Sequence, residues 1–233
     1  MTTPHTPARG IIFDFDGVLI DSEPLYLRSV NVILARCGVT QLTAAEYQQW
    51  IGSTAKLTWE ALTESKNLPE SAQEYQDQYE DVLEGVLRHE LALRPEAEDL
   101  LNVIERRGIP RGLATASRRK WMTLKLETLR LTNYFDAAVC STDVRRTKPE
   151  PDIYLRAAEL MALAPVDVIA IEDSPAGIHS AKSAGIRTIG LRTDMTTGLD
   201  LSEADEIIHN LHEFDVDRYL GEGAVTAPAQ QVR

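Results

Sequence analysis

Short apolar runs alternate with helical segments along most of this chain. The runs have the length of buried strands and are bounded by turn signals, and they cover residues 10–13, 111–115, 137–140, 168–173, 188–191 and 206–209. Strands that alternate with helices in this way form a parallel sheet whose two faces are covered by helices. The sequence therefore predicts an α/β core built on a parallel sheet.

Residues 24–90 interrupt this alternation, because they contain no convincing strand pattern. Their apolar side chains recur at helical spacing, opposite an acidic stripe, as in the set Tyr75, Tyr79, Val82 and Val86. We expect an all-helical insert here. Two later helices are well marked: one over 95–107 that Gly108 ends, and one that Ser174 caps and Gly185 ends. The last residues, 221–233, have no pattern and predict a flexible tail.

Composition excludes several classes of function. The net charge of -12 would repel a phosphate backbone or an anionic membrane, so neither a nucleic acid nor a membrane is expected as a partner. No apolar run approaches the ~20 residues of a membrane helix, and the first residues lack the apolar stretch of a secretory signal, so a cytoplasmic location is expected. Only Cys37 and Cys140 occur, which excludes a disulfide framework or a cysteine-rich zinc site.

Carboxylates follow two of the predicted strands. Asp14 and Asp16 come directly after the first strand, and Glu172 and Asp173 end the run that begins at residue 168. Ligands of open α/β sheets bind at the carboxyl ends of the strands, so these groups should converge if the two strands are neighbours. Such a cluster repels itself unless a cation is present, and oxygen ligands without histidine or cysteine favour Mg²⁺.

Groups that bind anions follow the strands between them. The run 111–115 ends in Thr115-Ala116-Ser117, which offers hydroxyls and backbone N–H groups, and Lys148 precedes Pro149, which favours an extended backbone there. The same loops are rich in cations despite the acidic net charge: Arg118, Arg119, Lys120, Arg145, Arg146 and Lys148. We expect a locally favourable field for a small anion at this edge of the sheet.

Together these segments resemble the four motifs of the haloacid dehalogenase (HAD) superfamily. The matching residues are Asp14-Phe15-Asp16-Gly17-Val18, Thr115, Lys148 in Lys-Pro-Glu-Pro-Asp, and Glu172-Asp173-Ser174-Pro175-Ala176-Gly177. The resemblance extends from residue 9 to residue 211. The insert is similar to the small helical cap of the branch that contains β-phosphoglucomutase and many sugar-phosphate phosphatases, in which the cap closes over a Rossmann-like core.

The resemblance implies a mechanism. Asp14 would attack phosphorus to give an aspartyl-phosphate, and Asp16 would be the acid and base. The residues expected to bind the phosphoryl oxygens are Thr115, Ala116, Ser117, Arg118 and Lys148. The Asp14 and Asp173 side chains and the Asp16 carbonyl would hold Mg²⁺, with Glu172 either a direct ligand or a support for the others. Asp16 argues against carbon–halogen cleavage, since dehalogenating members lack an acid at that position.

The cap departs from the phosphomutase pattern at two places. Tyr26 stands where β-phosphoglucomutase-like enzymes carry a histidine, and the loop Gly52-Ser53-Thr54-Ala55-Lys56 lacks their arginine. Lys56 either replaces that arginine or is an exposed lysine at the start of a helix. We expect Tyr26, Gly52, Ser53 and Lys56 to select the substrate.

The prediction is thus a Rossmann-like core, residues 1–21 and 92–233, with a helical cap, residues 22–91. It would be a Mg²⁺-dependent hydrolase of small phosphate monoesters such as phosphosugars, whose partner is a small phosphorylated metabolite, and would be a monomer or small homo-oligomer. Two alternatives stay open: a phosphosugar mutase, and a non-catalytic protein that binds a phosphometabolite.

Overall fold

The computed structural model describes residues 6–50 and 54–222. Within them lies a six-stranded parallel sheet in the order β3-β2-β1-β4-β5-β6. The strands are β1 (Gly10–Phe13), β2 (Arg111–Thr115), β3 (Ala137–Cys140), β4 (Val168–Glu172), β5 (Arg187–Leu191) and β6 (Glu206–Ile208). The predicted α/β fold with a parallel sheet is confirmed.

The strand order reverses at β1. The chain builds β2 and β3 on one side of β1 and then returns to place β4 on the other side, so that Ile12 pairs with both Gly112 and Ala170. A reversal of this kind leaves a crevice at the carboxyl ends of the two central strands. The ends of β1 and β4 therefore lie side by side, where the predicted site requires them.

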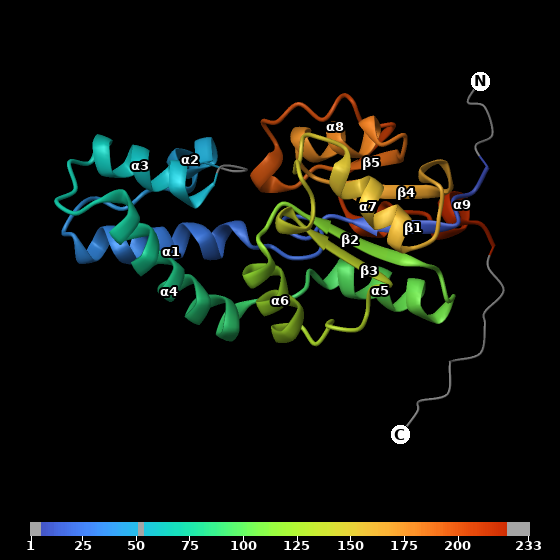
Figure 1. Cartoon of the computed structure of the whole chain (residues 1–233), viewed down its shortest axis with the longest axis horizontal. Coiled ribbons are helices and arrows are strands. Elements are labelled where there is room, and N and C mark those ends of the chain that lie inside the picture. Colours follow the sequence, from blue (N-terminus) through green and yellow to red (C-terminus); the bar gives the residue numbers. More distant parts are fainter. Residues whose placement is uncertain (1–5, 51–53, 223–233) are drawn as a thin grey trace.

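Alternate residues of each strand face opposite layers of helices. Ile11 and Phe13 belong to one hydrophobic cluster and Ile12 to another. The first cluster includes residues of α5 (Pro95–Arg106) and α6 (Arg119–Thr128), and the second includes residues of α7 (Asp152–Leu160) and α8 (Pro175–Ser183), so the two pairs cover opposite faces (Figure 1). The short α9 (Val216–Leu220) completes the core.

Helices α1 (Glu23–Arg36), α2 (Ala44–Tyr47), α3 (Ala55–Ser65) and α4 (Ala72–Glu90) form a separate group beside the carboxyl ends of the strands (Figure 1). Helices α1 and α3 pack against α4. The centre of this group is the fully buried Trp59, whose ring stacks on Tyr75 with centroids 5.7 Å apart. The insert is therefore helical, as predicted, and has apolar contacts of its own.

Two linkers join this group to the core, and they lie next to each other. Ile20 forms an antiparallel bridge with Leu93, and the backbone N–H of Arg94 donates to the carbonyl of Leu19 at 2.9 Å. Arg94 also forms an ion pair with Asp21 at 3.4 Å. The proposed boundaries after residue 21 and before residue 92 remain a prediction.

The strands predicted over 10–13, 111–115 and 137–140 have these bounds in the structure, and the other three predicted strands differ by one residue at one end. The helix expected over 95–107 ends at Arg106, and Ser174 caps α8 by accepting a hydrogen bond from the N–H of Gly177. Short 3-10 turns that periodicity did not indicate occur at 48–50, 141–143, 165–167, 194–196 and 211–213. Among the described residues, every helix is too short or too polar to cross a bilayer.

Candidate active site

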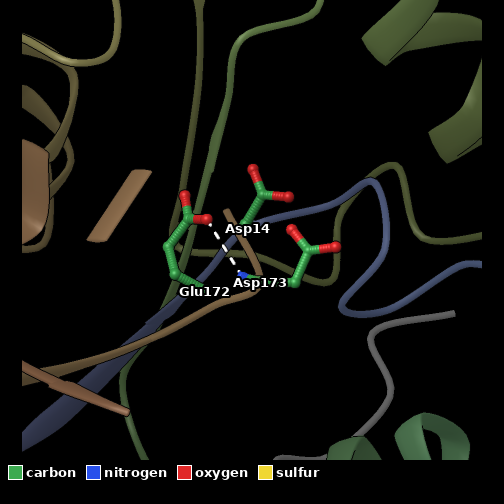
Figure 2. A group of neighbouring side chains, drawn as sticks. All are labelled: Asp14, Glu172 and Asp173. Atoms are coloured by element: carbon green, nitrogen blue, oxygen red, sulfur yellow. Dashed lines mark hydrogen bonds between the residues drawn. The ribbon is translucent and has the colours of Figure 1, made fainter. Parts of the chain in front are cut away.

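Three carboxylates converge at the boundary between β1 and β4. Asp14 follows β1, Glu172 ends β4 and Asp173 follows it, and one oxygen of each lies within 4.8 Å of the others. All three residues are buried. Figure 2 shows their carboxyl groups side by side, with one Glu172 oxygen accepting a hydrogen bond from the backbone N–H of Asp173. We call these three residues the acidic cluster.

Lys148 is the cation inside the acidic cluster. Its ammonium donates to Asp14 and to Glu172, both at 2.5 Å, and to the carbonyl of Ala114 at the end of β2 at 2.9 Å. Burial opposes its charge, but the two carboxylates raise the pKa of Lys148 above its usual value. Burial also raises the pKa of Asp14 to about 7, although Lys148 acts in the opposite direction.

Glu172 is fully buried and held on every side. Besides Lys148, it accepts hydrogen bonds from the hydroxyl of Tyr154 at 2.8 Å and from the backbone N–H and hydroxyl of Ser174. A Cβ on Gly177 would lie 2.0 Å from this carboxyl group, so only glycine lets the first turn of α8 approach so closely. These contacts fix Glu172 as an anchor for Lys148.

Asp173 carries the uncompensated charge of the acidic cluster. Within the described part of the chain, no donor contacts its carboxylate, whereas Asp14 and Glu172 share Lys148. Burial, followed by the charges of Asp14 and Glu172, raises the pKa of Asp173 well above its usual value. Three ionised carboxylates and one ammonium leave two negative charges, which a divalent cation would balance.

Asp16 belongs to a different group. Its carboxylate accepts hydrogen bonds from Ser22 at 2.6 Å, Tyr26 at 2.7 Å and Ser117 at 3.0 Å, and from Lys125 to both oxygens at 2.6 Å. Burial alone would raise the pKa of Asp16, but Lys125 and the hydroxyl donors lower it to about 2. The two aspartates therefore have separate environments, although they are two residues apart.

The other predicted residues occupy varied positions. Thr115 is buried at the end of β2, where its hydroxyl accepts from the N–H of Ser117 at 3.1 Å, and Ala116 is exposed beside it. Arg118 pairs with Glu80 of α4. Lys56 is exposed on α3 and pairs with Glu60 at 3.8 Å. Gly52 and Ser53 lie outside the described residues. The roles predicted for these residues are not tested by their positions.

Sequence reasoning missed several side chains of the site, among them Ser22, Lys125 and Tyr154. Lys125 left a signal, because it lies four residues after Trp121 and three after Met122, which are both buried on α6. A lysine on the apolar face of a helix needs a buried anion as partner. Ser22 and Tyr154 left none, since their partners come from distant parts of the chain.

A family model described as haloacid dehalogenase-like hydrolase matches residues 11–191. The chain belongs to this family. The resemblance noted in the sequence is thereby confirmed, and the acidic cluster lies at the strand ends that carry the matching motifs.

Named relatives cover nearly the whole chain of this HAD-like hydrolase. It is 30% identical to a phosphorylated carbohydrates phosphatase of Thermotoga maritima, over 84% of this chain and 91% of the relative. It is 29% identical to the phosphoglycolate phosphatase of Escherichia coli K12, over 88% and 90%. The structure of a putative β-phosphoglucomutase from Thermotoga maritima matches with a TM-score of 0.75 and 27% identity, over 86% of this chain and 94% of that one.

The raised pKa of Asp14 predicts how pH changes stability without divalent cations. The unfolded chain releases this proton near pH 3.8 and the folded chain near pH 7, so the folded state is favoured less and less as pH rises between these values. Asp14→Asn should remove this loss, which is at most about 4 kcal/mol at ~1.4 kcal/mol per pKa unit. Urea denaturation in a chelator at pH 4.5 and pH 7.5 measures it; equal pH dependence of variant and wild type would contradict it.

Proposed function

We propose that this HAD-like hydrolase is a Mg²⁺-dependent phosphatase of small phosphate monoesters that forms an aspartyl-phosphate at Asp14. The observation that carries the proposal is the contact of Asp14 with Lys148 inside the acidic cluster, whose three carboxylates the single ammonium balances only in part. Asp16 lies outside this cluster and is bound by Lys125. The family supports it, as do the two relatives named as phosphatases.

The proposed reaction has two halves. An oxygen of Asp14 bonds to phosphorus while the ester bond breaks, and the leaving oxygen takes a proton from Asp16. Water then attacks phosphorus, gives a proton to Asp16 and displaces Asp14, which releases inorganic phosphate. The donors around Asp16 hold its pKa at about 2, which favours the ionised form that accepts the proton from water. Asp16 must therefore take up a proton before it can protonate the leaving oxygen in the first half.

The groups that would neutralise the phosphoryl charge lie in the segments that follow β2 and β3. The Lys148 ammonium, which is 5% exposed, is held where it can face the phosphoryl oxygens beside Asp14. The hydroxyl and backbone N–H groups after Thr115 lie at the neighbouring strand end. Donors fixed in place before the reaction cost no reorganisation when charge develops.

The acidic cluster fits Mg²⁺, because its donors are hard oxygens and its ionised carboxylates leave two negative charges that Lys148 does not balance. We propose that the side chains of Asp14 and Asp173 and the carbonyl of Asp16 hold the ion. Glu172 would act as the anchor of Lys148, since its oxygens are already engaged. When bound, the ion supplies charge that offsets the negative phosphoryl group.

Glu23 favours a hydroxylated substrate over an anionic one. It begins α1, and its Oε2 atom is buried without a hydrogen-bond partner in the described part of the chain. Burial and the charge of Asp16 raise the pKa of Glu23 to about 7, and Glu23 adds to the negative field at Asp173. A substrate hydroxyl could bond to this oxygen, whereas above pH 7, where Glu23 is mainly ionised, a substrate carboxylate would be repelled. We therefore propose a sugar or polyol phosphate as the substrate class.

A phosphosugar mutase is the second candidate, because the fold neighbour from Thermotoga maritima has that description and 27% identity. At the position where such enzymes have histidine, Tyr26 donates to Asp16. Conversion of a hexose 1-phosphate into the 6-phosphate in a coupled assay, without release of phosphate, would favour the mutase.

The proposal predicts phosphate release from a panel of metabolite monoesters with Mg²⁺ and loss of turnover in a chelator. Asp14→Asn should lower kcat at least about a thousandfold, because the nucleophile is lost, and leave the fold intact. Asp200→Asn, which alters an exposed carboxylate, is the matched control and should behave as wild type. Turnover by Asp14→Asn within tenfold of wild type would exclude Asp14 as nucleophile, and binding without turnover by wild type would favour a non-catalytic role.

The proposed role of Glu23 predicts a ratio of kcat/KM values between two substrates. We expect kcat/KM for hexose 6-phosphates to exceed that for phosphoglycolate at least about tenfold, and Glu23→Gln to reduce this ratio by a similar factor, since one repelling charge is removed. Glu64→Gln on α3 removes an exposed charge of the same helical group as a control. An unchanged ratio in Glu23→Gln would show that this carboxyl group does not select the substrate.

The loop after β1 predicts an effect on ion affinity. Gly17 has φ of +85°, and a Cβ there would lie 1.9 Å from Oδ2 of Asp173. Gly17→Ala should therefore displace Asp173 and weaken Mg²⁺ binding by tenfold or more in calorimetric titration. Gly38→Ala has a similar φ of +67° but meets no atom within 4 Å, so it controls for backbone strain. Equal affinities of the two variants would mean that Asp173 does not hold the ion.

A further inference from the structure

Lys125 is a buried lysine that the four family motifs do not contain. It lies in the middle of α6 and its side chain is 0% exposed. Lysine is almost never fully buried unless an anion pairs with it. Among the described residues the carboxylate within ion-pair distance is that of Asp16, so the position of Lys125 is tied to one functional group.

The ammonium of Lys125 contacts Asp16 symmetrically. It donates to both carboxylate oxygens at 2.6 Å and to the hydroxyl of Ser117 at 3.1 Å. The rings of Phe15 and Tyr26 lie 5.6 and 5.4 Å from it and favour a cation at that place. A carboxylate bound through both oxygens cannot rotate without losing a contact, so Lys125 sets the direction of the Asp16 oxygens.

The remaining donors to Asp16 come from two parts of the molecule. Ser22 and Tyr26 belong to the start of α1, in the helical group, while Ser117 and Lys125 belong to the core. If α1 moves relative to the core, the hydroxyls of Ser22 and Tyr26 move with it. Lys125 lies on the core helix α6, so its contact with the Asp16 carboxylate would not change with such a movement.

We propose that Lys125 is the positioning residue of Asp16, which orients the acid and base of the reaction without touching the substrate. This inference rests on the phosphatase function proposed above. The two buried lysines would then have different roles, since Lys148 pairs with Asp14 and Lys125 pairs with Asp16.

The dependence of kcat/KM on the leaving group tests this role. This constant reports the step in which the ester bond breaks, and an alkyl leaving group needs the proton of Asp16 while nitrophenolate leaves without it. In Lys125→Met, we expect kcat/KM for an alkyl phosphate to fall at least about a hundredfold and that for nitrophenyl phosphate to fall less than tenfold. Lys125→Arg, which keeps the charge and the donors, should restore most of the alkyl activity.

Matched variants separate positioning from folding. Lys182→Met removes a partly exposed lysine of α8 that pairs with Asp205, and it should leave the hydrolysis of both substrates unaffected. The ratio of kcat/KM for the two substrates is measured on one preparation of each variant. A smaller folded fraction lowers both values equally and leaves their ratio unchanged. If Lys125→Met does not fold, Lys125→Gln takes its place.

In an Asp16→Asn background, Lys125→Met should change nitrophenyl phosphate hydrolysis less than threefold, because the carboxylate that Lys125 orients is absent.

Equal losses for the two substrates in Lys125→Met, or additive losses in the double variant, would overturn the positioning role and leave Lys125 as a structural residue. If wild type hydrolyses neither substrate, the proposed function itself fails. If wild type hydrolyses both and the ratio does not change, only the inference about Lys125 fails.

Discussion

The crowding of three buried carboxylates around one ammonium is the constraint on which this molecule depends. Asp14, Glu172 and Asp173 bring more negative charge to the end of the sheet than Lys148 balances. In an apolar surrounding such an excess is unfavourable unless a proton or a cation offsets it. Burial raises the pKa values of Asp14 and Asp173, and the charges of the neighbouring carboxylates raise them further. The same excess makes the cluster suited to a divalent ion beside a phosphoryl group.

Asp16, the second aspartate of the first motif, lies outside the acidic cluster. Asp16 is surrounded by donors from α1, β2 and α6, and it is strongly acidic where Asp14 is weakly acidic. Two carboxylates two residues apart thus acquire different proton affinities from different partners. In the proposed reaction, this difference would let one short segment provide both a nucleophile and a separate acid and base.

The helical group contributes to the same site from the opposite side. Its first helix supplies Ser22, Glu23 and Tyr26 close to Asp16, and α4 is tied to α6 of the core through Glu80 and Arg118. The substrate would therefore be enclosed between a core that carries the chemistry and helices that carry the selectivity. Such a division would account for relatives as different in substrate as a phosphorylated carbohydrates phosphatase and a phosphoglycolate phosphatase.

The sequence by itself determined the strands, the parallel sheet, the helical insert and the positions of Asp14, Lys148, Glu172 and Asp173, because period and strand-end placement are local properties. Only the tertiary structure decided which charges meet. It joined Lys125 to Asp16 over 109 residues, used Tyr154 to hold Glu172, and set Arg118 against Glu80 of α4. Such partners depend on how helices pack and turn relative to the sheet, and packing across long separations in the chain leaves almost no periodic signal to read.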